Sequence, residues 1–150
     1  QPHFIAERGD QYRADVDPED LPWLYRCRRL AEAGIPVAAG TDAPFGDADP
    51  WASMRAAVRR RTPSGHLLGP GERLTPAQAL RLYLGDPAAP GGPARRLAPG
   101  APADLCLLAV PGRELLAEPL GLDGLDGAGG LDAAAGALTV AAGAVVHSAS

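Results

Sequence analysis

The sequence contains no lysine and lacks several residue patterns on which common functions depend. Its two cysteines, Cys27 and Cys106, form neither a Cys-x-x-Cys motif nor a disulfide framework, and both are expected to be reduced and packed in cores. No apolar run approaches the ~18 residues that a membrane span needs, and no signal peptide is visible. No Gly-x-Ser-x-Gly elbow occurs and no base is placed for Ser53 or Ser64, so serine hydrolysis is not supported.

Positive charge is in deficit, because the formal net charge is -4 at pH 7. Binding to a phosphate backbone needs a positive surface, so nucleic acid is not predicted as a partner, and neither is a membrane. The local exception is Arg59-Arg60-Arg61, which we interpret as basic residues at the negative C-terminal end of a helix. The absence of lysine beside abundant alanine, glycine and proline is interpreted as compositional bias.

Three Asp-Pro or Thr-Pro steps mark helix starts, because each places a capping residue before a proline at the first helical position. Apolar residues at helical spacing follow each step. We predict helices over residues 17–33, 51–61 and 75–84. Asp49, at the second step, is therefore interpreted as a helix cap and not as a catalytic acid. Residues 1–5 are predicted to form a strand and residues 6–17 a polar loop.

Asp42 follows a short apolar run that is typical of a buried strand. The run and its flanks read Ile35-Pro-Val-Ala-Ala-Gly-Thr-Asp-Ala-Pro44, in which Gly40 allows a close backbone approach. A strand that ends in a carboxylate delivers an acid to the rim of an active site. An aspartate in this place also commonly serves only to cap a loop. From these residues alone, both interpretations of Asp42 stay open.

The C-terminal part is predicted to be a small β structure. Residues 85–102 are crowded with proline and glycine and are interpreted as a connecting segment. A strand is predicted over residues 105–110, and two strands about a glycine turn over 138–147. Residues 121–136 are predicted to be irregular, and their aspartates fit neither an EF-hand nor a regular calcium repeat.

Further motifs occur in a fixed order around Asp42. They are Gln1-Pro-His-Phe4, Gly40-Thr-Asp-Ala-Pro44, Ala56-Ala-Val-Arg-Arg-Arg-Thr-Pro-Ser-Gly65 and Pro99-Gly-Ala-Pro-Ala-Asp-Leu105. This order resembles the C-terminal part of metal-dependent amidohydrolases, in the branch called amidohydrolase family 3. The resemblance extends over nearly the whole chain.

The resemblance implies an α/β fold made of the last two strand-helix units of a (β/α)8 TIM-type barrel, followed by part of a small C-terminal β-sandwich domain. Residues 1–84 would belong to the barrel, 85–102 to the connection and 103–150 to the β-sandwich. A whole barrel needs about 250 residues, and the chain has 150. It also begins with Gln1 inside an apolar run, so we interpret it as a fragment of an enzyme.

The resemblance also implies chemistry for Asp42. The aspartate at the end of the eighth barrel strand would be both a ligand of a divalent metal, taken to be zinc, and the general base that acts on a metal-activated water. The substrate would be a small amide-type molecule with a non-peptide C–N bond. The family's other metal ligands, histidines on earlier strands, have no counterpart among His3, His66 and His147. The chain alone is therefore expected to hold no metal and to be inactive.

Three further residues are candidates for the substrate site. His3 lies on the predicted neighbouring strand and could contact substrate, or could simply be packed. Thr41 could orient the Asp42 carboxylate, or be an ordinary residue at a strand end. His66 could lie over the site if its Thr-Pro-Ser-Gly loop folds back, or could be solvated.

A second hypothesis is a non-catalytic α/β remnant or interaction module. Strands that lack their barrel neighbours would leave exposed edges for self-association. In that case Asp42 would have no catalytic role. The protein is expected to be cytoplasmic under either hypothesis.

Overall fold

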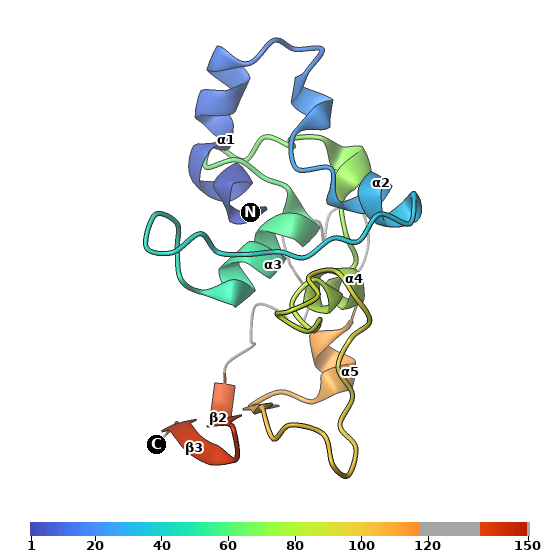
Figure 1. The fold of residues 1–150 in the computed structure, drawn as a ribbon. Coiled ribbons are helices and arrows are strands. Elements are labelled where there is room, and N and C mark those ends of the chain that lie inside the picture. Colours follow the sequence, from blue (N-terminus) through green and yellow to red (C-terminus); the bar gives the residue numbers. More distant parts are fainter. Residues whose placement is uncertain (118–135, 150) are drawn as a thin grey trace.

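The computed structural model describes residues 1–117 and 136–149 and shows a mixed α/β chain (Figure 1). Helices precede a small sheet, with one short helix between the first two strands. In order the elements are α1 (His3–Asp15), the 3-10 helix η1 (Leu21–Trp23), α2 (Cys27–Glu32), α3 (Pro50–Arg59), the 3-10 helix η2 (Pro70–Glu72), α4 (Pro76–Arg81), β1 (Leu105–Leu108), α5 (Gly112–Leu115), β2 (Gly136–Ala141) and β3 (Ala144–Ser148). Of the predicted irregular segment 121–136, all but Gly136 lies outside the described residues.

Helix α3 begins where the sequence predicts, at the cap formed by Asp49. The Asp49 carboxylate accepts hydrogen bonds from the backbone N–H groups of Trp51 (2.9 Å) and Ala52 (3.1 Å), while Pro50 occupies the first helical position. A salt bridge from Arg55 to the same carboxylate, at 2.9 Å, reinforces the cap. The prediction that Asp49 caps a helix is confirmed.

Helix α4 also begins at its predicted residue and completes the core. Thr75 and Gln78 form a reciprocal capping box, in which each side chain accepts a hydrogen bond from the other residue's backbone N–H. The buried faces of α3 and α4 meet, and α5 adds one leucine. The buried core consists of Met54, Ala57, Val58, Leu74, Ala79, Leu82 and Leu115.

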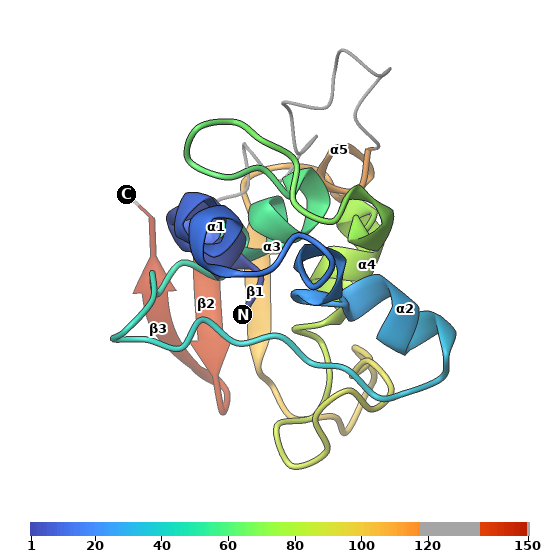
Figure 2. The same cartoon turned by 90° about the horizontal axis from the view of Figure 1, so that it is seen from above.

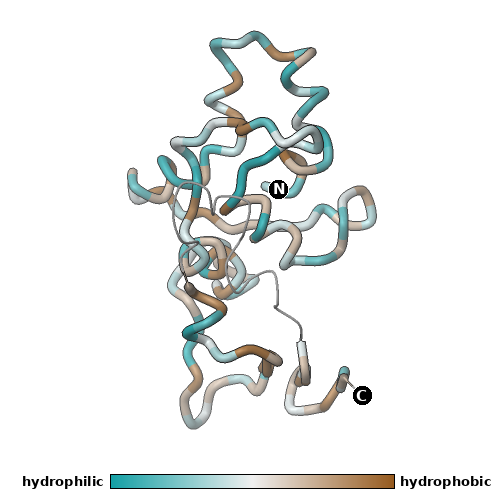
Figure 3. The backbone as a smooth tube through the Cα atoms, turned by 180° about the vertical axis from the view of Figure 1, so that it is seen from behind, coloured by the Kyte–Doolittle hydropathy of each residue, from teal (hydrophilic) through white to brown (hydrophobic). Residues whose placement is uncertain are grey.

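The three strands form an antiparallel sheet in the order β1-β2-β3. The predicted pair of strands about a glycine turn is confirmed, with Ala142 and Gly143 between β2 and β3. Much of this sheet is exposed, including the side chains of Leu107, Val145 and Val146. Figure 3 shows hydrophobic stretches in this C-terminal part, away from the α3 and α4 core.

The predictions for residues 1–17 are wrong. Residues 1–5 form no strand and residues 6–17 form no loop, because α1 extends from His3 to Asp15. A strand needs a neighbouring strand for its backbone groups, and residues 1–104 provide none. A helix satisfies those groups within its own segment. Residues 4–8 and 11–14 include Ala, Glu, Arg and Gln, which favour a helix.

The strand predicted before Asp42 is not formed either. Residues 35–41 are neither helix nor strand, and their backbone bonds include Ala39 N–H to Leu82 O at 3.1 Å. Neither of the two barrel strands expected in residues 1–84 is therefore present. The predicted strand before Asp42 fails for the same reason as the predicted strand over residues 1–5, since an apolar run becomes a strand only when a partner strand pairs with it.

Arg60 was predicted to be one of three basic residues at the C-terminal end of a helix, but it is buried. It follows the last turn of α3 with a left-handed backbone (φ 52°), and its side chain is buried, with 1% exposed. The guanidinium donates hydrogen bonds to the carbonyl oxygens of Leu68 (2.7 Å), Tyr25 (2.9 Å) and Leu24 (2.8 Å). It therefore joins three segments of chain, a role that the helix-dipole interpretation of Arg59-Arg60-Arg61 does not include.

The cysteines are reduced, as predicted, but their burial is not as predicted. Cys27 is half-buried and Cys106 is exposed. Burial raises the pKa of the Cys27 thiol. None of the helices in residues 1–117 and 136–149 is long and apolar enough to cross a membrane.

Candidate active site

Asp42 lies on a tight turn in the long loop between α2 and α3. Its backbone has φ 56°, a left-handed conformation that aspartate tolerates better than most residues. Its carbonyl oxygen accepts hydrogen bonds from the N–H groups of Phe45 (2.9 Å) and Gly46 (3.0 Å). The residue is exposed, so the turn fixes the backbone of Asp42 and leaves its side chain accessible.

His3 lies in the first turn of α1, against the Asp42 turn. Its side chain is buried, with 2% exposed, and neither ring nitrogen has a hydrogen-bond partner among the described residues. Burial lowers the pKa of His3, and the charge of the N-terminal amine lowers it further. The negative charges of Glu7, Asp42 and Asp47 act in the opposite direction. The neutral imidazole therefore lies within electrostatic range of Asp42.

Gly46 is what allows His3 and the turn to approach so closely. A Cβ added at Gly46 would overlap Nε2 of His3 and lie 2.5 Å from the carbonyl oxygen of Thr41. Thr41, half-buried, therefore lies at the same place as His3 and Asp42. Figures 1 and 2 show the loop running past the N-terminal end of α1. The structure brings three of the four predicted site residues together.

We expect Gly46→Ala to destabilise the chain by about 1–3 kcal/mol, because the added methyl group has no space between His3 and Thr41. Gly40→Ala in the same loop is the matched control, since a Cβ there meets nothing within 4 Å. Urea unfolding followed by circular dichroism measures both changes. Equal stability of the two variants would contradict the close approach of His3 to the turn.

The fourth predicted residue, His66, belongs to a different contact network. Its Nδ1 lies 3.0 Å from Ser64 Oγ, and Ser64 donates hydrogen bonds to the Asp10 carboxylate from both its hydroxyl and its backbone N–H. Asp10 lies seven residues beyond His3 in α1, about 10 Å along the helix axis. His66 therefore holds its loop on the middle of α1 and does not join the Asp42 turn.

The Ser64 network was not predicted, since no sequence pattern places a base beside this serine. Its geometry is unlike that of a catalytic triad, in which the acid orients the histidine through the ring nitrogen remote from the serine. Here Asp10 binds Ser64 directly. Hydrogen bonds from the side chains of Ser64 and Thr62 lower the pKa of Asp10. The network fixes the 62–66 turn on α1 and gives Ser64 no nucleophilic role.

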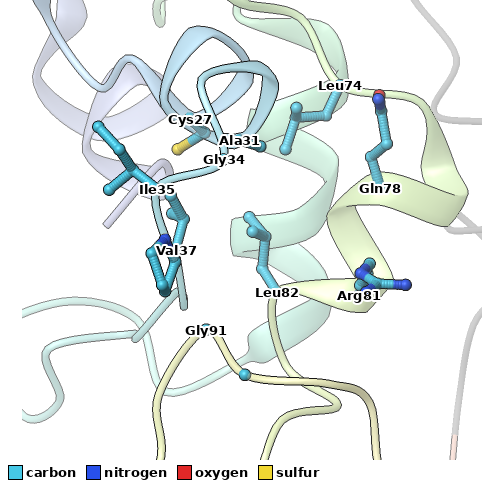
Figure 4. A pocket seen from close by; sticks show the side chains of 12 residues that line it. Cys27, Ala31, Gly34, Ile35, Val37, Leu74, Gln78, Arg81, Leu82 and Gly91 are labelled. Carbon is cyan, nitrogen blue, oxygen red and sulfur yellow. The ribbon is translucent and has the colours of Figure 1, made fainter.

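Residues just before Asp42 line a cavity of about 250 Å³ between α2, α4 and the 91–92 loop. Figure 4 shows Ile35 and Val37 facing Leu82 and Leu74 across this space, with Cys27 and Gln78 also lining it. Asp42 does not line this cavity. The walls of the cavity are mostly apolar, and Arg81 is the one charged residue that lines it.

The residues present do not fit a complete metal site. The turn brings His3 near the carboxylates of Glu7, Asp42 and Asp47, but the His3 ring is buried behind Gly46. In the ranges 1–117 and 136–149 no group of three His, Cys, Asp or Glu side chains could hold a metal ion. A structural or catalytic zinc site uses at least three protein ligands.

Comparison with known proteins assigns the family. Residues 1–147 match the profile of the amidohydrolase family. The chain is also 38% identical over 69 residues to an N-substituted formamide deformylase of Arthrobacter pascens, a match that covers 46% of this chain and 13% of that protein. No solved structure matches the chain significantly. That family is generally metal-dependent. Because the profile matches nearly the whole length of this chain, the chain belongs to the amidohydrolase family.

Proposed function

We propose that this chain is the C-terminal portion of a hydrolase that cleaves non-peptide C–N bonds in small amide-type substrates, with Asp42 as its catalytic carboxylate. The observation that carries this proposal is the turn at residues 42–46, which fixes the backbone of Asp42 and leaves its side chain open to solvent. A residue held in a sparsely populated backbone conformation is often found at a functional site. Membership of the amidohydrolase family supports the type of bond.

Asp42 would act as a general base and then as a general acid. Its ionised carboxylate accepts a proton from the water that attacks the carbonyl carbon of the amide. It then donates that proton to the departing amine nitrogen as the C–N bond breaks. Exposure in the free chain suits this role, because the carboxylate must be reachable by both water and substrate.

The metal of the complete enzyme, which we propose to be zinc, would lower the pKa of the attacking water. Asp42 would be one of its ligands, and the remaining ligands would come from residues outside this chain. Thr41 and His3 would help to hold the turn that presents Asp42, and His66 would contribute only through the 62–66 turn on α1.

The barrel arrangement and the domain boundaries are part of the same proposal. Residues 1–84 would supply the last two strand-helix units, 85–102 the connection and 103–150 part of a β-sandwich. Residues 35–40 support this arrangement, because they are mostly apolar and belong to no helix, so a neighbouring strand could pair with them. Ile35 is 50% exposed here, as expected for a segment that a neighbour would cover.

The purified 150-residue chain is expected to bind less than one zinc ion per molecule and to release no amine from N-substituted formamides. The reason is that its described residues supply no set of three ligands. Elemental analysis after gel filtration and an amine-release assay measure the two properties. Stoichiometric zinc retained through gel filtration would overturn the proposal that the other ligands lie elsewhere.

A second candidate function is an interaction module, and the sheet is the observation that favours it. Strands β1 and β3 are the outer strands of the described sheet, and all five residues of β3 are exposed. Open strand edges pair readily with another chain, so self-association is possible. This candidate requires no role for Asp42, so the effect of changing Asp42 in the complete protein distinguishes the two.

A further inference from the structure

The guanidinium of Arg8 packs into the corner formed by two phenylalanine rings beside the Asp42 turn. Its central carbon is 4.5 Å from the centre of the Phe4 ring and 4.3 Å from the centre of the Phe45 ring. The rings themselves are 6.0 Å apart in an edge-to-face arrangement. Phe4 is buried in α1, whereas Phe45 is 66% exposed. The two rings therefore hold the flat guanidinium in place.

The hydrogen-bond donors of Arg8 are not used within the chain. An aromatic ring contacts a guanidinium through the ring's face and offers its N–H groups no acceptor oxygen, and the five N–H donors lie in the plane of the guanidinium. Across residues 1–117 and 136–149, Arg8 packs on the two rings and forms neither an ion pair nor a hydrogen bond. By contrast, Arg28, Arg29 and Arg95 each pair with a carboxylate.

Arg8 is also close to the proposed catalytic carboxylate. Phe45, on which it stacks, is the fourth residue of the turn that begins at Asp42, and the N–H of Phe45 donates to the Asp42 carbonyl oxygen at 2.9 Å. The first and fourth Cα atoms of such a turn lie within about 7 Å of each other. A small substrate could therefore contact Asp42 at one end and Arg8 at the other.

We propose that Arg8 binds a carboxylate group of the substrate, so that the preferred substrates are N-acyl or N-formyl compounds that carry a negative charge. This inference rests on the proposed function of Asp42. A planar guanidinium with free in-plane donors binds a carboxylate through two parallel hydrogen bonds. Because Phe4 and Phe45 already hold the guanidinium on two sides, little side-chain entropy is lost on binding.

The test compares two substrates of nearly equal size in the complete protein. N-formyl-β-alanine carries a carboxylate, and N-formylpropylamine replaces that carboxylate with a methyl group. We expect Arg8→Gln to lower the ratio of kcat/KM for the charged over the neutral substrate by about ten- to a hundred-fold, mainly through KM. Arg8→Lys keeps the charge but not the two parallel donors, and it should restore part of the ratio.

The outcomes separate this inference from the proposed function. An unchanged ratio in Arg8→Gln, with or without lower rates for both substrates, would leave Arg8 as a packing residue and overturn the inference alone. If the wild-type protein hydrolyses either substrate and Asp42→Asn does not lower that rate, the proposed function of Asp42 fails instead.

A binding measurement does not depend on turnover or on the glutamine variant folding. In the ¹⁵N-labelled 150-residue chain, the Nε–Hε signal of Arg8 can be assigned by its loss in Arg8→Lys. We expect this signal to shift saturably with N-formyl-β-alanine and not with N-formylpropylamine. Equal or absent shifts with the two compounds would count against a carboxylate site at Arg8.

Discussion

Replacing Asp42 by asparagine in the complete protein is expected to lower kcat for amide hydrolysis by about 10²–10⁴-fold, the usual contribution of a general base. Asparagine keeps the size of the side chain and tolerates the left-handed backbone at this position (φ 56°). It cannot accept a proton from water at neutral pH. Because Asp42 is exposed, the free energy of unfolding should change by no more than about 0.5 kcal/mol.

Asp47→Asn is the matched control, because it makes the same acid-to-amide change in the same loop. The Asp47 side chain accepts a hydrogen bond from the Asp49 N–H at 2.9 Å, and the amide oxygen of asparagine can accept it as well. We expect this variant to keep most of the wild-type kcat. Amine release and urea unfolding should be measured on both variants, so that a loss of activity can be separated from a loss of fold.

A loss of the same size in both variants would assign the effect to the negative charge of the loop in general. Full activity in Asp42→Asn would mean that Asp42 serves the turn alone. In that case the exposed edges of β1 and β3 would become the better guide to function. The comparison of the two asparagine variants therefore decides between the enzyme and the interaction module.

Local signals in the sequence predicted two of the three helix starts. The third is wrong, because Asp17 begins no helix, and η1 (Leu21–Trp23) and α2 (Cys27–Glu32) stand where one helix over residues 17–33 was predicted. Asp49 and Thr75 cap helices at the predicted residues because a cap depends on neighbours two or three positions away. The turn between β2 and β3 was predicted for the same reason, since Gly143 supplies the left-handed backbone that the turn needs (φ 82°). Motif order gave the family, which the profile match over residues 1–147 confirms.

Structure that depends on distant partners was predicted poorly. Apolar runs at residues 1–5 and 35–39 look like buried strands, but a strand forms only beside another strand, and this chain supplies none there. Burial of Cys106 failed similarly, because it is exposed on β1, an outer strand of the described sheet. Ser64 and Asp10 are 54 positions apart in the sequence, and no local pattern predicts their contact.

The candidate site was predicted in part. His3, Thr41 and Asp42 come together because Gly46 leaves space for the His3 ring. A glycine two residues after a proline does not by itself indicate such a close approach. Arg8 was missed, since one arginine among the polar residues of α1 looks like an ordinary exposed side chain. Only its stacking on Phe4 and Phe45 sets it apart.

Arg60→Met is expected to destabilise the chain by about 3 kcal/mol, a large effect for one side chain. Methionine fills much of the same volume but leaves the carbonyl oxygens of Leu24, Tyr25 and Leu68 without their donors. A buried acceptor that loses its partner costs about 1–3 kcal/mol, and this applies in full to Leu68, while the hydrogen bonds to Leu24 and Tyr25 are partly buried and add less. Since a domain of this size is stable by about 5–15 kcal/mol, such a change removes a large share.

Arg28→Met is the control, because Arg28 forms an exposed i,i+4 pair with Glu32 on α2, and such pairs contribute about 0.3–0.5 kcal/mol. Urea unfolding midpoints measure both variants, and similar values would contradict the clamp that Arg60 forms. Arg60→Lys adds a second comparison. Burial lowers the pKa of Arg60, which means that the site disfavours the charged form. The ammonium of lysine would be disfavoured in the same way, and it lacks the planar guanidinium that reaches three carbonyl oxygens. We therefore expect lysine to recover less than half of the lost stability, because the geometry of the guanidinium, and not its charge, holds the three segments together.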